Sequence, residues 1–110
     1  MTVQELKEKL NLKVISGQKG LNRVIEGGYT SDLLSDVMGN AEMNQCWITL
    51  QTHKNIMAIA SLKELACIIL VKDLEPNPDT IEQSNEEGIP ILSSSKEAFE
   101  ITGEIYSLLK

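Results

Sequence analysis

The chain has 110 residues, of which 42% are hydrophobic and 24% are charged, close to the averages of folded globular proteins. A chain of this length builds about one domain with an ordinary core, and neither a disordered nor a fibrous protein is favoured. Sixteen acidic residues against ten basic ones give a formal charge of -6, which would repel a phosphate backbone, so nucleic acid is not expected as a partner.

The front of the chain predicts one helix followed by short strands. Thr2 and Glu5 fit a capping box, and the apolar spacing behind them predicts a helix over residues 3–10. Residues 12–30 combine β-branched pieces with glycines. This pattern indicates one or two short strands joined by turns.

The apolar pattern LLSDVM predicts the next helix. Ser31 or Thr30 fits its N-cap, and Gly39 with Asn40 is a good C-terminal stop. The following stretch CWITLQ, residues 46–51, has the β-branched and aromatic content of a strand.

The second half of the chain repeats helix and strand. Residues 53–66 predict a helix that begins near Thr52, although NIMAIA within it is also compatible with a strand. Residues 67–71 are continuously apolar, which is typical of a strand covered on both faces of a parallel sheet.

The last third predicts two helices around a short strand. Asn77 and Pro78 fit the N-cap and first turn of a helix that Gly88 closes, and IPIL then indicates a buried strand. A serine cap at Ser93 or Ser94 is expected to open the last helix. The apolar positions of that helix are Ala98, Phe99, Ile101, Ile105, Leu108 and Leu109.

Alternation at these short spacings indicates βαβ units, whose right-handed crossovers build a parallel sheet covered by helices. The expected fold class is therefore α/β, a mostly parallel sheet flanked by helices, in one domain over residues 1–110. No apolar run reaches the roughly 18 residues of a membrane span, and no targeting segment opens the chain. We expect a cytoplasmic protein without a membrane partner.

No complete catalytic motif is present. The phosphate cradle GxxxxGK[ST] is absent, and GQKGLNR, residues 17–23, favours a short turn. His53 is the only imidazole, and no GxSxG surrounds a serine. Cys46 and Cys67 lack a CxxC partner and are interpreted as small core residues in a reducing compartment. We therefore expect neither an enzyme, nor a metal site, nor a cofactor.

Three hydroxyl-rich loops are the candidate binding site: GGYTSD at residues 27–32, QTHKN at residues 51–55 and SSSK at residues 93–96. In a parallel sheet, strand-to-helix loops gather beyond the carboxyl ends of the strands, where helix N-termini present free amides that suit a phosphate or nucleotide. Asp32 would oppose an anion in the first loop, so the second and third are the better contacts. The alternative is that these residues only cap helices. The candidate residues are Gly27, Gly28, Tyr29, Thr30, Ser31, Thr52, His53, Ser93, Ser94 and Ser95.

The run from Gly27 to the end of the chain resembles the DRTGG domain, most specifically in the segments GGYTSDLLSDVM, WITLQTHKNIMAIASL and GIPIL. The front of the chain, TVQELKEKLNLKVISGQKGLNR, is similar to the start of the same module in the N-terminal domain of HPr kinase/phosphorylase. Together the two likenesses cover nearly the whole chain. The literal string DRTGG is absent, and VKDLEP follows the apolar strand where a glycine-rich turn is expected.

The resemblance implies a bacterial α/β module that accompanies other domains, has a regulatory or scaffold role, and has no chemistry of its own. A kinase name would be inherited from a neighbouring domain. We expect a homodimer that also contacts an unidentified protein partner. Apolar residues that a domain this small is expected to cover incompletely would form the dimer surface; they are Val24, Ile25, Met43 and Trp47. The alternatives are a sensor domain that binds a nucleotide or phosphate at helix N-termini, and an uncharacterised enzyme.

Overall fold

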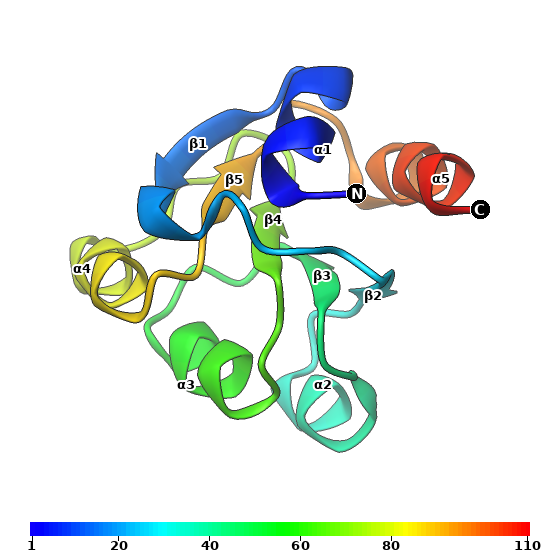
Figure 1. Cartoon of the computed structure of the whole chain (residues 1–110). Helices are drawn as coiled ribbons and strands as arrows, with labels where there is room; N and C mark the ends of the chain where they lie inside the picture. The colour runs from blue at the N-terminus through cyan, green and yellow to red at the C-terminus, as the bar shows by residue number, and fades with distance from the viewer.

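The structure, a computed structural model, describes all 110 residues as a sheet between two layers of helices (Figure 1). The strands are β1 (Lys13–Ser16), β2 (Gly27–Thr30), β3 (Gln45–Thr49), β4 (Cys67–Leu70) and β5 (Ile91–Ser93). The helices are α1 (Val3–Leu10), α2 (Leu34–Asn40), α3 (Asn55–Leu62), α4 (Pro78–Glu87) and α5 (Ala98–Leu109), with a 3-10 turn η1 (Gln18–Gly20).

The sheet is mostly parallel, as predicted. Its strand order is β1-β5-β4-β3-β2, in which β2, β3, β4 and β5 run parallel and β1 pairs antiparallel with β5. Consecutive parallel strands are connected by α2, α3 and α4 in turn, because two parallel strands need a crossover segment that returns the chain to the same end of the sheet. The carboxyl ends of the four parallel strands therefore lie side by side along one end of the sheet, which we call the carboxyl edge.

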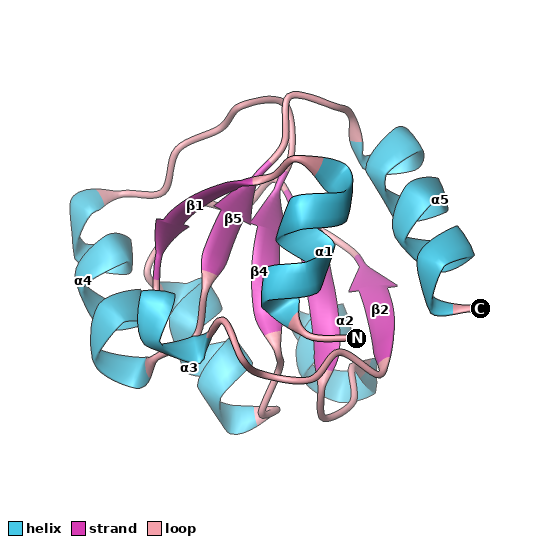
Figure 2. Cartoon of the chain, turned by 45° about the horizontal axis from the view of Figure 1, so that its top comes forward, coloured by secondary structure: helices cyan, strands magenta, loops and turns pink.

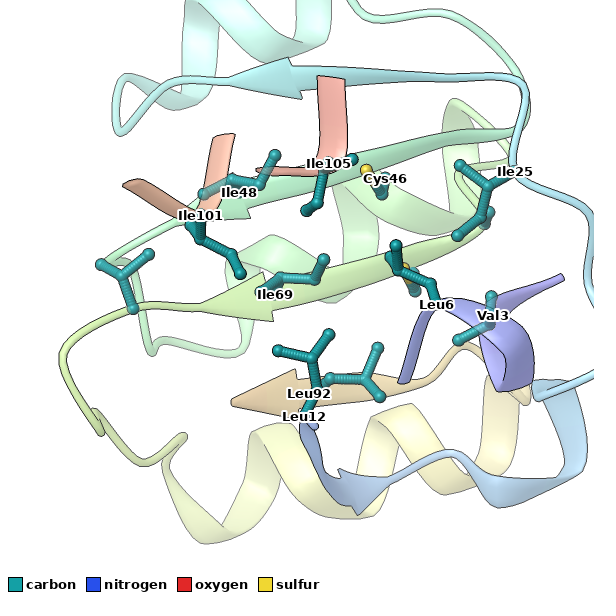
Figure 3. Close-up of a cluster of buried hydrophobic side chains, with 13 residues drawn as sticks. Val3, Leu6, Leu12, Ile25, Cys46, Ile48, Ile69, Leu92, Ile101 and Ile105 are labelled. Carbon is teal, nitrogen blue, oxygen red and sulfur yellow. The ribbon is translucent and has the colours of Figure 1, made fainter. Parts of the chain in front are cut away.

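Two helices cover one face of the sheet and three cover the other. Figures 1 and 2 show α1 and α5 on one side and α2, α3 and α4 on the opposite side. Side chains alternate along β3, so Cys46 and Ile48 point into the α1/α5 layer while Trp47 enters the other core. Figure 3 shows the first core, where Ile101 and Ile105 of α5 pack near Ile48. No helix combines the length and the apolar composition needed to cross a bilayer.

Several predicted boundaries are confirmed. Thr2 and Glu5 form the capping box of α1, with the Glu5 N–H donating to Thr2 Oγ1 over 3.1 Å and the Thr2 N–H donating to Glu5 Oε1 over 2.9 Å. α4 begins at Pro78 and ends at Glu87, and Gly88 caps it with a φ of 65°, the left-handed conformation that glycine adopts without strain. NIMAIA is helical, and both cysteines are core residues.

The predicted loop GGYTSD is wrong in its first four residues. Gly27–Thr30 is strand β2, because parallel pairing with β3 extends to its last residue. α2 begins at Leu34 after an extended Leu33, so neither Thr30 nor Ser31 caps it. The Ser31 hydroxyl instead accepts the Leu33 N–H over 3.2 Å, a local turn that competes with capping.

Two further helices begin later than predicted. α3 begins at Asn55 rather than near Thr52, and α5 begins at Ala98 rather than after Ser93 or Ser94. Ser93 is the last residue of β5 and is buried, as is the residue that follows it. The serines therefore belong to the end of the strand and its turn, several residues before the helix.

Candidate functional site

The carboxyl edge of the sheet brings together the second and third predicted loops with a fourth segment, residues 71–77. The Asn77 N–H donates to the Thr52 carbonyl over 3.1 Å, and the Asn77 side-chain amide lies 3.4 Å from His53 Nδ1. The Asp73 N–H donates to the Ser94 carbonyl over 2.9 Å. The loops thus meet as the parallel topology predicts. The backbone amides of Asp73 and Asn77 that join them are already hydrogen-bonded within the chain and are not free to bind a ligand.

Asp32 ties the first loop to the end of β3. Its Oδ1 accepts the Thr49 hydroxyl over 2.9 Å and the Leu50 N–H over 2.8 Å, and its carbonyl accepts the Gln51 side-chain amide over 2.8 Å. The carboxylate therefore has a structural role between the ends of β2 and β3. Its negative charge also opposes an anion there, as the sequence predicts.

The turn after β4 holds two non-glycine residues in the left-handed conformation. Lys72 has a φ of 60° and Asp73 a φ of 56°, a conformation that costs about 1 to 2 kcal/mol for such residues. Their amides donate to the carbonyls of Lys96 and Ser94, both over 2.9 Å. This turn is the stretch where the sequence lacks the expected glycines, and its two amides are occupied by the neighbouring loop.

Most predicted site hydroxyls are also satisfied within the chain. Tyr29 donates to Asp36 Oδ1 over 2.8 Å, and this hydrogen bond to a carboxylate raises the pKa of Tyr29. Thr30 Oγ1 lies 2.8 Å from Thr102 Oγ1 of α5. Ser94 Oγ accepts the Lys96 N–H over 3.0 Å. The hydroxyls therefore act mainly as structural hydrogen-bonding groups.

The exposed members of the predicted site are few and separated. His53 and Ser95 are exposed at the carboxyl edge, whereas Ser93 and Ser94 are buried. Gly27 and Gly28 lie at the start of β2, at the opposite end of that strand from the edge loops. The ten predicted residues do not form one continuous surface.

A hollow of about 390 Å³ lies between β2 and the C-terminal half of α5. Gly28 of β2 lines the hollow, and because glycine has no side chain, this position adds nothing that would fill it. Thr102, Tyr106 and Lys110 line it from α5. The glycine pair thus borders a space beside α5 rather than a cradle at a helix start.

The outward face of α5 is the most exposed apolar surface. Phe99 is 90% exposed and Tyr106 is 68% exposed, with Gly103 between them on the same side of the helix. We call Phe99, Gly103, Tyr106 and Lys110 the α5 stripe, since these residues recur at the spacing of one helical face. Phe99 is an apolar position of the predicted last helix but does not face the core, because the core face of α5 is formed by Ile101 and Ile105.

The α5 stripe is held on a firmly packed helix. Ile101 is fully buried and Ile105 is 2% exposed, and both belong to the core under the sheet. Lys96 Nζ forms an ion pair with Glu104 Oε2, which connects the turn before α5 to its middle. The spacing of the sequence contains the signal for this surface, since aromatic residues seven apart lie on one face.

The residues predicted to form a dimer surface divide into two groups. Trp47 is fully buried and its indole N–H donates to the Ser31 carbonyl over 2.8 Å, and Ile25 is 3% exposed. The prediction that these two are incompletely covered is wrong, because the core on each face of the sheet is large enough to enclose them. Val24 and Met43 are exposed, as predicted.

Two comparisons place the chain among known proteins. A family model of the DRTGG domain matches residues 5–108. A similar fold occurs in the CBS and DRTGG domains of the regulatory region of a Clostridium perfringens pyrophosphatase, complexed with its activator diadenosine tetraphosphate. The TM-score is 0.66 at 10% sequence identity, and the match covers 93% of this chain and 44% of that chain. The present chain therefore corresponds to less than half of that regulatory region.

Proposed function

The chain belongs to the DRTGG domain family, and from this premise we propose that it is a non-catalytic regulatory module that acts by self-association and by contact with a protein partner. The α5 stripe is the observation that carries the proposal. Removing an apolar side chain such as Phe99 from water is favourable, so a partner that covers it would be stabilised by the contact. Its own chain leaves Phe99 90% exposed.

The size of the exposed aromatic surface suits an association site. With about 200 Å² for one aromatic side chain, Phe99 and Tyr106 together expose on the order of 300 Å². The largest apolar patch on a monomer is commonly of this size and is often functional. Aromatic residues are also enriched where protein partners bind.

Light scattering across a micromolar concentration range tests this function. We expect the native chain to form a homodimer and the Phe99→Ser variant to be monomeric. Leu62→Ser is the matched control, because Leu62 is 68% exposed on α3, on the other side of the sheet. A native chain that stays monomeric at high micromolar concentration contradicts self-association.

A nucleotide or phosphate sensor is the second candidate function. Its support is the gathering of Thr52, His53 and the Ser93–Ser95 turn beyond the carboxyl ends of parallel strands, the usual ligand position in open α/β sheets. The regulatory region of similar fold was solved with a dinucleoside polyphosphate. Against this function stand the Asp32 carboxylate and the occupied amides of the turn at residues 71–77.

A thermal-shift screen with adenine and guanine nucleotides and inorganic phosphate tests the sensor function. A ligand at a hundred times its Kd stabilises the folded state by about 2.7 kcal/mol, which raises the Tm of a chain of this length by about 12 °C. His53→Ala and Ser94→Ala should both remove the shift. No shift with any of these ligands leaves the loop hydroxyls with a structural role alone.

The cytoplasmic location and the likeness of the front segment to HPr kinase/phosphorylase stay predictions.

A further inference from the structure

We infer that the α5 stripe pairs with the α5 stripe of a second copy of this chain, with the two helices antiparallel about a two-fold axis beside Thr102 and Gly103. The inference rests on the proposed function and specifies the partner and the geometry of its association. It follows from the spacing of the stripe, from Gly103, from the distribution of charge, and from the area available.

The spacing of the two aromatic residues is symmetric about the middle of α5. An antiparallel pair related by a two-fold axis places a residue before the axis opposite the residue equally far behind it. Phe99 and Tyr106 are equally distant from the point between Thr102 and Gly103. Each Phe99 therefore contacts the partner's Tyr106, and the contact occurs twice.

Neither packing nor backbone conformation within a single copy requires glycine at position 103. A Cβ added at this position would meet no atom within 4 Å, and its backbone conformation is not one that requires glycine. Glycine in a helix interior destabilises the helix relative to alanine. A neighbouring backbone that approaches closely gives glycine a reason, and the middle of the stripe is where two crossing helices are closest.

Charge favours a second copy in the antiparallel orientation. The N-terminal half of α5 carries the exposed Glu100, whereas the C-terminal end carries Lys110, whose Nζ lies 5.9 Å from the centre of the Tyr106 ring. Antiparallel packing brings Lys110 toward the start of α5 in the other copy, where Glu97 and Glu100 are exposed and Lys96 is already paired with Glu104. Parallel packing would instead place Glu100 beside its own counterpart, which is unfavourable.

The two aromatic residues supply about half of the area that a symmetric pair needs. Two copies that each cover on the order of 300 Å² of aromatic surface remove about 600 Å² from water. Thr102, Gly103 and Ser107 line an open hollow of about 720 Å³ on the same helix and add further contact area. A stable specific interface buries about 1,200 Å² or more, so the two aromatic pairs supply about half of it.

Disulfide cross-linking of Gly103→Cys tests the position of the axis. Cys46 and Cys67 are fully buried, so the introduced thiol is the accessible one. A two-fold axis beside residue 103 places the two introduced thiols near each other, and mild oxidation should convert the variant to a covalent dimer. Leu62→Cys is the control, since Leu62 is exposed on α3, away from the axis.

A second variant keeps the inference falsifiable if Gly103→Cys disturbs packing. Phe99→Glu should raise the dimer Kd roughly thirtyfold or more, as expected when a central aromatic residue is lost from an interface. Rapid cross-linking at Gly103→Cys with none at Leu62→Cys supports the inference. A dimer that persists in Phe99→Glu and does not cross-link through residue 103 overturns the geometry while self-association stands. A monomeric native chain overturns both.

Discussion

Asp32→Ala should destabilise the fold, because the carboxylate joins the first loop to the end of β3. Asp32 Oδ1 accepts two hydrogen bonds, from the Thr49 hydroxyl and from the Leu50 N–H. Both donors lie at the end of β3, so the hydrogen bonds connect the loop to the neighbouring strand. The change in unfolding free energy of the variant therefore shows whether this loop has a structural role or is free to bind a ligand.

The expected loss is about 2 kcal/mol. Each hydrogen bond contributes about 1 kcal/mol net at a solvent-exposed acceptor such as Asp32, and Thr49, which is 1% exposed, would be left with an unpaired donor. Unfolding entropy of about 2.1 cal/mol/K per residue amounts to about 0.23 kcal/mol/K for this chain. The Tm should therefore fall by about 9 °C.

Urea unfolding followed by the fluorescence of Trp47 measures this loss at the site itself. Trp47 is the only tryptophan, and its indole N–H donates to the carbonyl of Ser31, the residue before Asp32. Asp32→Asn keeps an oxygen that can accept both hydrogen bonds but removes the charge that strengthens them, so it should lose about half as much stability. Glu86→Ala removes the same charge from an exposed position on α4 and serves as the control.

A small effect would refute this reasoning. If the unfolding free energy of Asp32→Ala lies within about 0.5 kcal/mol of that of the native chain, the change behaves as an ordinary surface substitution. The carboxylate would then not hold the two loops together. The first loop would have to be reconsidered as a ligand-binding segment whose polar groups are available.

Three further predictions follow from contacts elsewhere in the molecule. Gly20→Ala should cost about 1 to 3 kcal/mol in a urea melt, because the added Cβ would lie 2.0 Å from a backbone carbonyl oxygen of the α4 C-terminus; a neutral change contradicts this. Burial raises the pKa of Cys46 to about 12 and also raises that of the second cysteine, so thiol reagents should label the chain only as it unfolds; rapid labelling of the folded chain contradicts this. Hydrogen bonds from Ser31 and Tyr29 lower the pKa of Asp36, so their stabilisation is present above the ordinary Asp pKa of 3.8 and is lost as the pH falls through the lowered value. Tyr29→Phe should therefore lose less stability on acidification, and parallel curves of Tm against pH for the two proteins would contradict this.

Local patterns in the sequence determined much of the fold. The capping box at Thr2 and Glu5 predicts the first turn of α1 because both partners lie within that turn. The apolar run of β4 predicts a strand covered on both faces, and the left-handed end of α4 is predicted by Gly88. Alternation of such elements was enough to predict the mostly parallel sheet.

Only the tertiary structure decided which apolar residues are covered and which hydroxyls are free. Trp47 is enclosed because α2 and α3 pack over its face of β3, whereas Phe99 projects from the side of α5 that no other element covers. Periodicity predicts that a face is apolar but contains no information on what lies against it. The same holds for the candidate site, since Asp32 and Thr30 find their partners 17 and 72 residues away. The role of such polar groups depends on contacts between distant segments, and these contacts form only when the sheet assembles.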